Sequence, residues 1–110
     1  ETVETSSNAV TLDTANSDVF EVSGAFRSAI NDYTDGSEVI DAISDSGLSV
    51  DTEGDLALVA LYDAGNAYLY EVEDNSGADG GGTGVLAADI TLVGVFEGVA
   101  ADGFTAENFV

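Results

Sequence analysis

The charge of this chain is almost entirely of one sign, and this limits what it can fold into and bind. Its 110 residues include 22 aspartates and glutamates against one arginine, Arg27, with no lysine or histidine, which gives a formal net charge of −21 at pH 7. A folded surface with this charge repels itself and repels polyanions. We therefore expect neither nucleic acid nor the anionic surface of a membrane as a partner. Divalent cations, a salty medium or a cationic surface suit the chain better.

The apolar content is that of one folded domain. Hydrophobic residues make up 45% of the chain, whereas a disordered acidic segment lacks the aliphatic and aromatic side chains present here. A chain of 110 residues can bury one modest core. No apolar run approaches the ~20 residues that a membrane-spanning helix requires. The chain begins with Glu1 rather than methionine, so we interpret it as an excised domain or a processed mature form.

The side chains on which most enzymes rely are missing. Histidine, cysteine and lysine are all absent, which removes most general bases and nucleophiles. The absence of cysteine also excludes disulfides and cysteine-bound zinc. We therefore expect a protein without catalytic activity.

The distribution of apolar residues divides the chain into an arm and a domain. Residues 1–17 are mostly polar and predict a loose N-terminal arm with one short strand, Val10–Leu12. Residues 18–110 predict a single acidic, β-rich domain, which opens with a strand at residues 19–22.

Two short helices are predicted after this strand. Behind a cap at Ser23, apolar side chains recur at three- and four-residue spacing, at Phe26, Ala29, Ile30 and Tyr33. Both predicted helices are short, so packing against a sheet must stabilise them.

The second predicted helix has a signal at each end. Asp35 is an N-cap residue with Glu38 three positions later, which is typical of a capping box. Residues 39, 40 and 43 are apolar and share one face, and Gly47 is the expected left-handed C-cap.

The rest of the chain is predicted to be β. Residues 56–62 are nearly all apolar, which is typical of a central strand covered on both faces. Turn-forming residues at 63–66 and alternating side chains at 67–73 predict a hairpin, and residues 90–96 predict a further strand. The predicted fold is mainly β (α+β), with an antiparallel sheet or small sandwich and the two short helices on one side.

An acidic loop after the hairpin is a candidate calcium site. Calcium takes six to eight oxygen ligands from a chain that can turn sharply around the ion. Glu73, Asp74, Asn75 and Asp79 supply such oxygens among glycines. The spacing is not that of an EF-hand, because Ala78 occupies a ligand position. A solvated acidic loop remains the alternative.

Two other motifs are set aside. The glycine-rich run at residues 81–86 has Leu86 where the nonapeptide of calcium-binding β-rolls requires aspartate, and it occurs once. The Asp-Ser-Gly triplet of aspartic proteases occurs at Asp45, Ser46 and Gly47. It directly follows a predicted helix, where these three residue types are expected simply because they end helices.

Several segments of the chain together carry a family resemblance. They are residues 18–24, residues 67–71, the acidic Gly-Asp loop, residues 92–95, and the closing run 104–110 with sequence FTAENFV. The chain from residue 18 onward resembles the C-terminal domain of proteins exported by type I (ABC) secretion systems, such as RTX-like proteins and bacterial surface (S-layer-like) proteins. Tandem calcium repeats upstream and the compact Asp-x-Asp-Gly pattern of that family are not found here.

The resemblance implies a role for the end of the chain. In that family the tail is an uncleaved export signal, which here corresponds to Glu107, Asn108, Phe109 and Val110. The implied partner during secretion is the ABC exporter. The alternative interpretation of these residues is a last edge strand that docks on the sheet.

Charge and resemblance together favour a location outside the cell, at the cell surface. An acidic chain stays soluble and extended where calcium is scarce, and folds where calcium is abundant enough to screen or bind its charges. Adaptation to high salt would produce the same acid excess. We therefore expect a non-catalytic, calcium-responsive structural protein of the bacterial surface. The alternative is a complete mature subunit of an extracellular filament, assembled when the N-terminal arm adds as a strand to a neighbour.

Overall fold

A computed structural model describes residues 2–14, 19–50, 56–73, 85 and 89–98. Strands dominate the part of the chain that it describes, which confirms the mainly β prediction. The elements in chain order are β1 (Thr2–Glu4), β2 (Val10–Leu12), β3 (Val19–Ser23), α1 (Gly36–Ile43), β4 (Leu48–Val50), β5 (Leu56–Asp63), β6 (Asn66–Glu73) and β7 (Ile90–Glu97).

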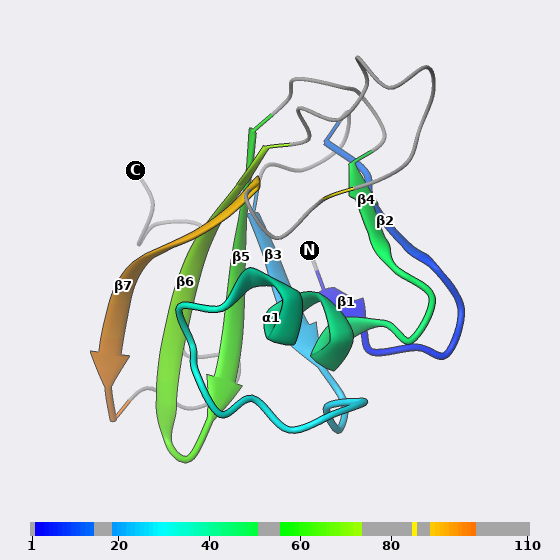
Figure 1. Ribbon diagram of the computed structural model, residues 1–110. Coiled ribbons are helices and arrows are strands. Elements are labelled where there is room, and N and C mark those ends of the chain that lie inside the picture. Colours follow the sequence, from blue (N-terminus) through cyan, green and yellow to red (C-terminus); the bar gives the residue numbers. More distant parts are fainter. Residues whose placement is uncertain (1, 15–18, 51–55, 74–84, 86–88, 99–110) are drawn as a thin grey trace.

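The main sheet is mixed rather than antiparallel. Its strand order is β1-β3-β5-β6-β7, in which β1, β3 and β5 are parallel and β5, β6 and β7 are antiparallel (Figure 1). The prediction of an antiparallel sheet is therefore wrong for the first half. Parallel neighbours need a long crossover, and the segment between β3 and β5, which contains α1 and β4, provides it. Strands β2 and β4 form a separate parallel pair.

The predicted hairpin is confirmed. Strands β5 and β6 pair along their whole length, from Leu56 opposite Glu73 to Asp63 opposite Asn66. The two residues between them, Ala64 and Gly65, both have positive φ, 53° and 82°. This backbone is what a two-residue type I′ turn requires, and it matches the twist of the strands.

The second predicted helix exists, but it ends earlier than expected. Asp35 is its N-cap, with the side chain accepting a hydrogen bond from the Ser37 N–H at 3.0 Å. The helix ends at Ser44, which is extended, whereas Gly47 lies beyond it with φ of +114°. The C-cap prediction is wrong because the Ser44 Oγ forms the turn itself, accepting from the N–H groups of Ser46 and Gly47 at 3.0 and 3.1 Å.

The first predicted helix does not form, and α1 is the one helix among the described residues. Residues 24–35 are irregular. Their backbone is bonded elsewhere: the Arg27 N–H donates to the Ala42 carbonyl at 2.8 Å, and the Asn31 N–H donates to Glu38 Oε1 at 2.6 Å. Three of the four apolar residues of the pattern, Phe26, Ile30 and Tyr33, still pack on the core, whereas Ala29 is exposed.

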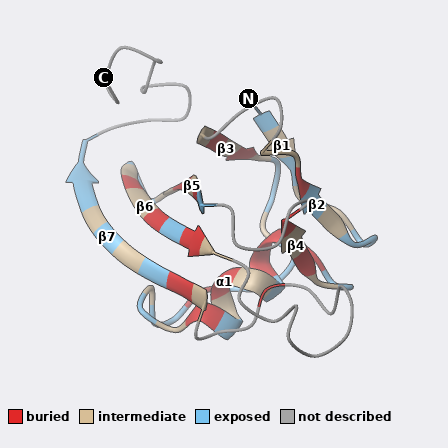
Figure 2. Cartoon of the chain, turned by 90° about the horizontal axis from the view of Figure 1, so that it is seen from above, coloured by how far each residue is buried: buried red, intermediate tan, exposed pale blue. Residues whose placement is uncertain are grey.

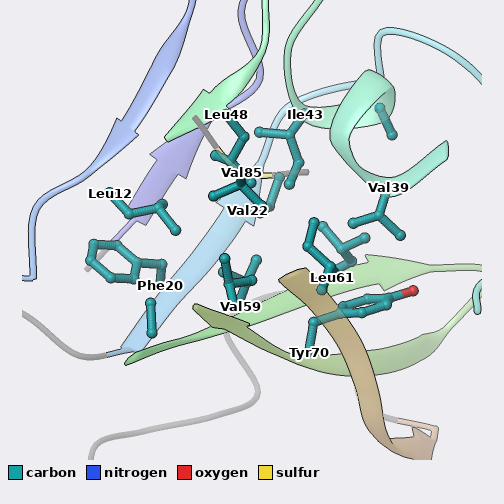
Figure 3. Packing of buried hydrophobic residues seen from close by; sticks show 14 of the residues in the cluster. Leu12, Phe20, Val22, Val39, Ile43, Leu48, Val59, Leu61, Tyr70 and Val85 are labelled. Carbon is teal, nitrogen blue, oxygen red and sulfur yellow. The ribbon is translucent and has the colours of Figure 1, made fainter. Parts of the chain in front are cut away.

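The hydrophobic core fills the space between the main sheet and a second layer made of α1 and the β2–β4 pair (Figures 1 and 3). Ser44 is the one buried polar residue among those described. The labelled core residues are Leu12, Phe20, Val22, Val39, Ile43, Leu48, Val59, Leu61, Tyr70 and Val85.

The described part of the predicted arm is joined to the domain. Strand β1 pairs with β3, and the N–H groups of Thr5, Ser6 and Val10 donate to carbonyls of Ser23, Ile43 and Gly47, each at 3.0 Å. Leu12 is in the core with 1% of its surface exposed. These residues are therefore part of the folded unit rather than a loose arm.

Candidate functional site

Most residues of the two predicted sites lie outside the described part of the chain. Of the calcium candidates, the structure describes Glu73, which ends β6 opposite Leu56 and is half-buried. Asp74, Asn75 and Asp79 lie beyond it, among the residues that are not described, as do all four residues of the predicted tail, Glu107, Asn108, Phe109 and Val110. Elsewhere, within the described ranges, no three acidic side chains gather closely enough to hold a metal ion.

The residues of the Asp-Ser-Gly triplet have structural contacts. Asp45 Oδ2 accepts from Nε and Nη2 of Arg27, at 3.1 and 2.8 Å, in an ion pair that is exposed on both sides. The Ser46 hydroxyl donates to the Ser7 carbonyl at 2.7 Å. Exposed ion pairs contribute little to stability. Through these contacts, Asp45 connects the end of α1 to the loop before the helix, and Ser46 connects it to the N-terminal segment.

Carboxylates near the start of α1 bind backbone groups. Asp32 Oδ1 accepts from the backbone N–H and the hydroxyl of Thr34, at 2.9 and 2.6 Å, and these bonds lower the pKa of Asp32. The hydroxyl and N–H of Ser37 lower the pKa of Asp35 in the same way. Glu38 does not close the predicted capping box, because its carboxylate accepts from the N–H of Asn31 instead.

A cluster of tyrosines lies where the loop before α1 crosses the hairpin. The rings of Tyr33 and Tyr68 are stacked with centroids 3.9 Å apart and planes 3° from parallel. The Tyr33 hydroxyl donates to Asp63 Oδ2, and the Tyr70 hydroxyl donates to the Tyr33 carbonyl at 2.8 Å. Sequence reasoning missed this cluster. The alternation of Tyr68 and Tyr70 along β6 placed them on one face, but nothing in the sequence indicated Tyr33 as their neighbour.

Two phenols of this cluster, those of Tyr33 and Tyr70, have a raised pKa. The hydrogen bond to Asp63, with burial and the charge of that carboxylate, raises the pKa of Tyr33 well above its ordinary value. Burial is the main reason that the pKa of Tyr70 is raised as well. Ionising Tyr33 would place a negative charge beside a carboxylate, and ionising Tyr70 would place one on a buried residue. The phenols of Tyr33 and Tyr70 are therefore neutral at ordinary pH.

Strand β7 presents apolar side chains to solvent. Val93, Val95 and Phe96 are 50%, 48% and 43% exposed, and β7 is the last strand of the described sheet (Figure 2). The pairing of β7 with β6 shifts register between Gly94 and Leu92. A bulge of this kind twists a strand and is common at sheet edges.

No helix in the described ranges is both long and apolar enough to cross a membrane; α1 has eight residues. No protein-family model, curated protein or solved structure matches the chain.

Proposed function

We propose that this chain is a non-catalytic module of a secreted bacterial surface protein whose stability responds to calcium. The observation that carries the proposal is the charge of −21 on a chain with a single cation. Its supporting feature in the fold is the separation of that charge from the core, where Ser44 is the buried polar residue among those described. Asp32, Asp35, Glu38 and Asp45 act as a turn acceptor, a cap, a backbone acceptor and an ion-pair partner, which are structural roles.

The calcium response is tested by thermal unfolding. We expect a midpoint several degrees higher in calcium chloride than in sodium chloride of equal ionic strength, since about 1 kcal/mol moves a small domain by about 4–8 °C. The double variant Asp74→Asn/Asp79→Asn removes the calcium-specific part of the rise. The matched control Asp41→Asn/Glu71→Gln removes two exposed charges elsewhere and keeps it. Equal midpoints in the two salts would eliminate the calcium site.

The export role of the tail rests on the resemblance and is tested separately. Residues 18–110 are fused to a passenger protein in cells that carry a type I exporter, and secretion of the passenger is measured. We expect secretion with the complete tail and a large loss when Asn108, Phe109 and Val110 are removed. Unchanged secretion after that truncation would refute the signal. Because the cut leaves the candidate calcium loop intact, the two tests fail independently.

The filament alternative is favoured by one observation and opposed by another. The exposed side chains of β7 would suit an acceptor edge, but both strands of the donor arm are already paired within their own chain, β1 with β3 and β2 with β4. Deleting the arm would also remove Leu12 from the core. The sharper test is Val95→Lys, with Leu56→Lys as a control of equal charge and similar exposure. A filament built on β7 disassembles only in the first variant.

A further inference from the structure

Three of the four tyrosines of the chain meet at one point of the fold, where the loop before α1 crosses strand β6. The rings of Tyr33 and Tyr68 lie face to face with centroids 3.9 Å apart. Both residues are half-buried, so small reagents in solvent have access to part of the pair. The hydrogen bond from the Tyr70 hydroxyl to the Tyr33 carbonyl fixes the loop at this position. The pair is thus ordered, in contact and partly accessible.

We propose that Tyr33 and Tyr68 are a cross-linking site, at which a one-electron oxidant joins them in an intramolecular dityrosine bond. The oxidant is of the kind that a peroxidase generates with hydrogen peroxide. Rings in van der Waals contact couple without a diffusional search, which is a large advantage over coupling between molecules. The chain has no cysteine, so a bond of this type is a covalent tie open to it where a disulfide is not. This inference does not depend on the proposed function.

The chemistry balances as a two-electron oxidation. Each phenol loses one electron and one proton and becomes a phenoxyl radical. The radicals join through one ring carbon ortho to each oxygen, and the hydrogen on each joined carbon then moves to the phenol oxygen to restore both rings. The two electrons and two protons reduce one hydrogen peroxide to two waters. The product is the folded chain with one new carbon–carbon bond and two fewer hydrogens.

Asp63 assists the first step as a positioning residue. Its carboxylate already accepts the hydrogen bond of the Tyr33 hydroxyl, at the end of β5 beside the hairpin turn. When an electron leaves Tyr33, the proton therefore has an acceptor in place and passes along the existing hydrogen bond. The proton of Tyr68 passes to water.

The test is oxidation of the folded chain by a haem peroxidase and hydrogen peroxide at low protein concentration. The readouts are dityrosine fluorescence, the intact mass, and proteolytic mapping of the linked peptides. We expect a monomer that has lost two hydrogens and whose linked peptides contain Tyr33 and Tyr68. Tyr33→Phe and Tyr68→Phe each lower the yield of this monomeric product at least about tenfold, since the remaining tyrosine then lacks its stacked partner. Tyr62→Phe is the matched control and leaves the yield unchanged.

Two further outcomes decide the roles of the neighbouring residues. Asp63→Asn keeps the pair in place but slows product formation, because the Tyr33 proton then has no carboxylate to accept it. Far-ultraviolet circular dichroism confirms that each variant is folded. A product that is exclusively dimeric, an equal loss of yield in Tyr62→Phe, or linked peptides without Tyr33 and Tyr68 would overturn the proposal.

Discussion

Ala64 holds the least favourable backbone conformation among the described residues. It is the one described non-glycine residue with positive φ, at 53°, and it occupies the first central position of the β5–β6 turn. The left-handed region costs an L-residue roughly 1–2 kcal/mol, and asparagine tolerates it better than alanine. We expect Ala64→Asn to raise the free energy of unfolding by about 0.5–1 kcal/mol. Urea denaturation measures the free energy of unfolding. Ala64→Val is the control variant, and it should lower that free energy.

Tyr70 combines a buried ring with a hydroxyl that has one specific task. Its side chain is 1% exposed and donates to the Tyr33 carbonyl at 2.8 Å. Tyr70→Phe leaves that carbonyl without this donor and should cost about 1–2 kcal/mol in urea unfolding near pH 8. A cost near zero would show that water replaces the hydroxyl.

The same phenols predict sensitivity to alkali. The pKa values of Tyr33 and Tyr70 are higher in the folded state than in the unfolded chain, where a tyrosine titrates near about 10. The folded state therefore holds its protons more tightly. The stability that they contribute is complete below pH of about 10 and is lost as the pH rises above it. Unfolding free energies at pH 8 and pH 11 measure the loss, which should be smaller in Tyr70→Phe than in the natural chain.

At the scale of the element, α1 depends on its first turn. The helix has eight residues, too few to be stable alone, and its N-cap Asp35 satisfies the Ser37 N–H. We expect Asp35→Ala to destabilise the protein by about 1 kcal/mol. Asp41→Ala removes the same charge from an exposed position of the same helix, where no cap is lost, and should change stability by less than about 0.5 kcal/mol. If the two variants are equally stable, the cap contributes nothing.

The loop at residues 24–35 shows where local pattern fails at this scale. Its apolar spacing is helical, and the side chains at 26, 30 and 33 do pack on the core. An isolated helix of that length is marginal, so backbone bonds to distant partners prevail. The Arg27 N–H donates to the Ala42 carbonyl. Gly24, with φ of +90°, packs so close to Thr5 that a Cβ at position 24 would lie 2.8 Å from the Thr5 hydroxyl oxygen. These partners are distant in sequence, and no local signal identifies them.

At the scale of the whole molecule, self-repulsion is the dominant electrostatic effect. Of the described groups, Arg27 alone is a cationic side chain, and it is paired with Asp45. Raising sodium chloride from 0.01 to 1 M shortens the screening length from about 30 to about 3 Å. With a chelator present throughout, we expect the thermal midpoint of unfolding to rise by at least about 5 °C over this range of sodium chloride. Most of the rise should occur in the lower part of the range. A thermal midpoint that does not depend on salt would show that repulsion between the carboxylates does not affect stability.

The candidate sites could be predicted only in part. The acidic loop that begins at Glu73 and the tail from Glu107 to Val110 were identified by composition and resemblance, and they remain predictions, since the structure describes Glu73 alone among them. The tyrosine pair was not predicted, because Tyr33 and Tyr68 are adjacent only after the crossover places the loop over β6. Residue types reveal which chemistry is available, whereas contact between distant residues depends on topology.

By itself, the sequence determined the charge, the apolar run of β5, the alternation of β6, the turn between them and the N-cap of α1, because each of these depends on residues within a few positions of one another. Only the tertiary structure decided that β1, β3 and β5 run parallel, that residues 24–35 are not helical, and that the N-terminal segment belongs to the fold. These outcomes rest on hydrogen bonds and burial between segments far apart along the chain. The free energy of these long-range contacts outweighs the local conformational preferences of the segments. The local sequence pattern does not reveal which distant segments will pair.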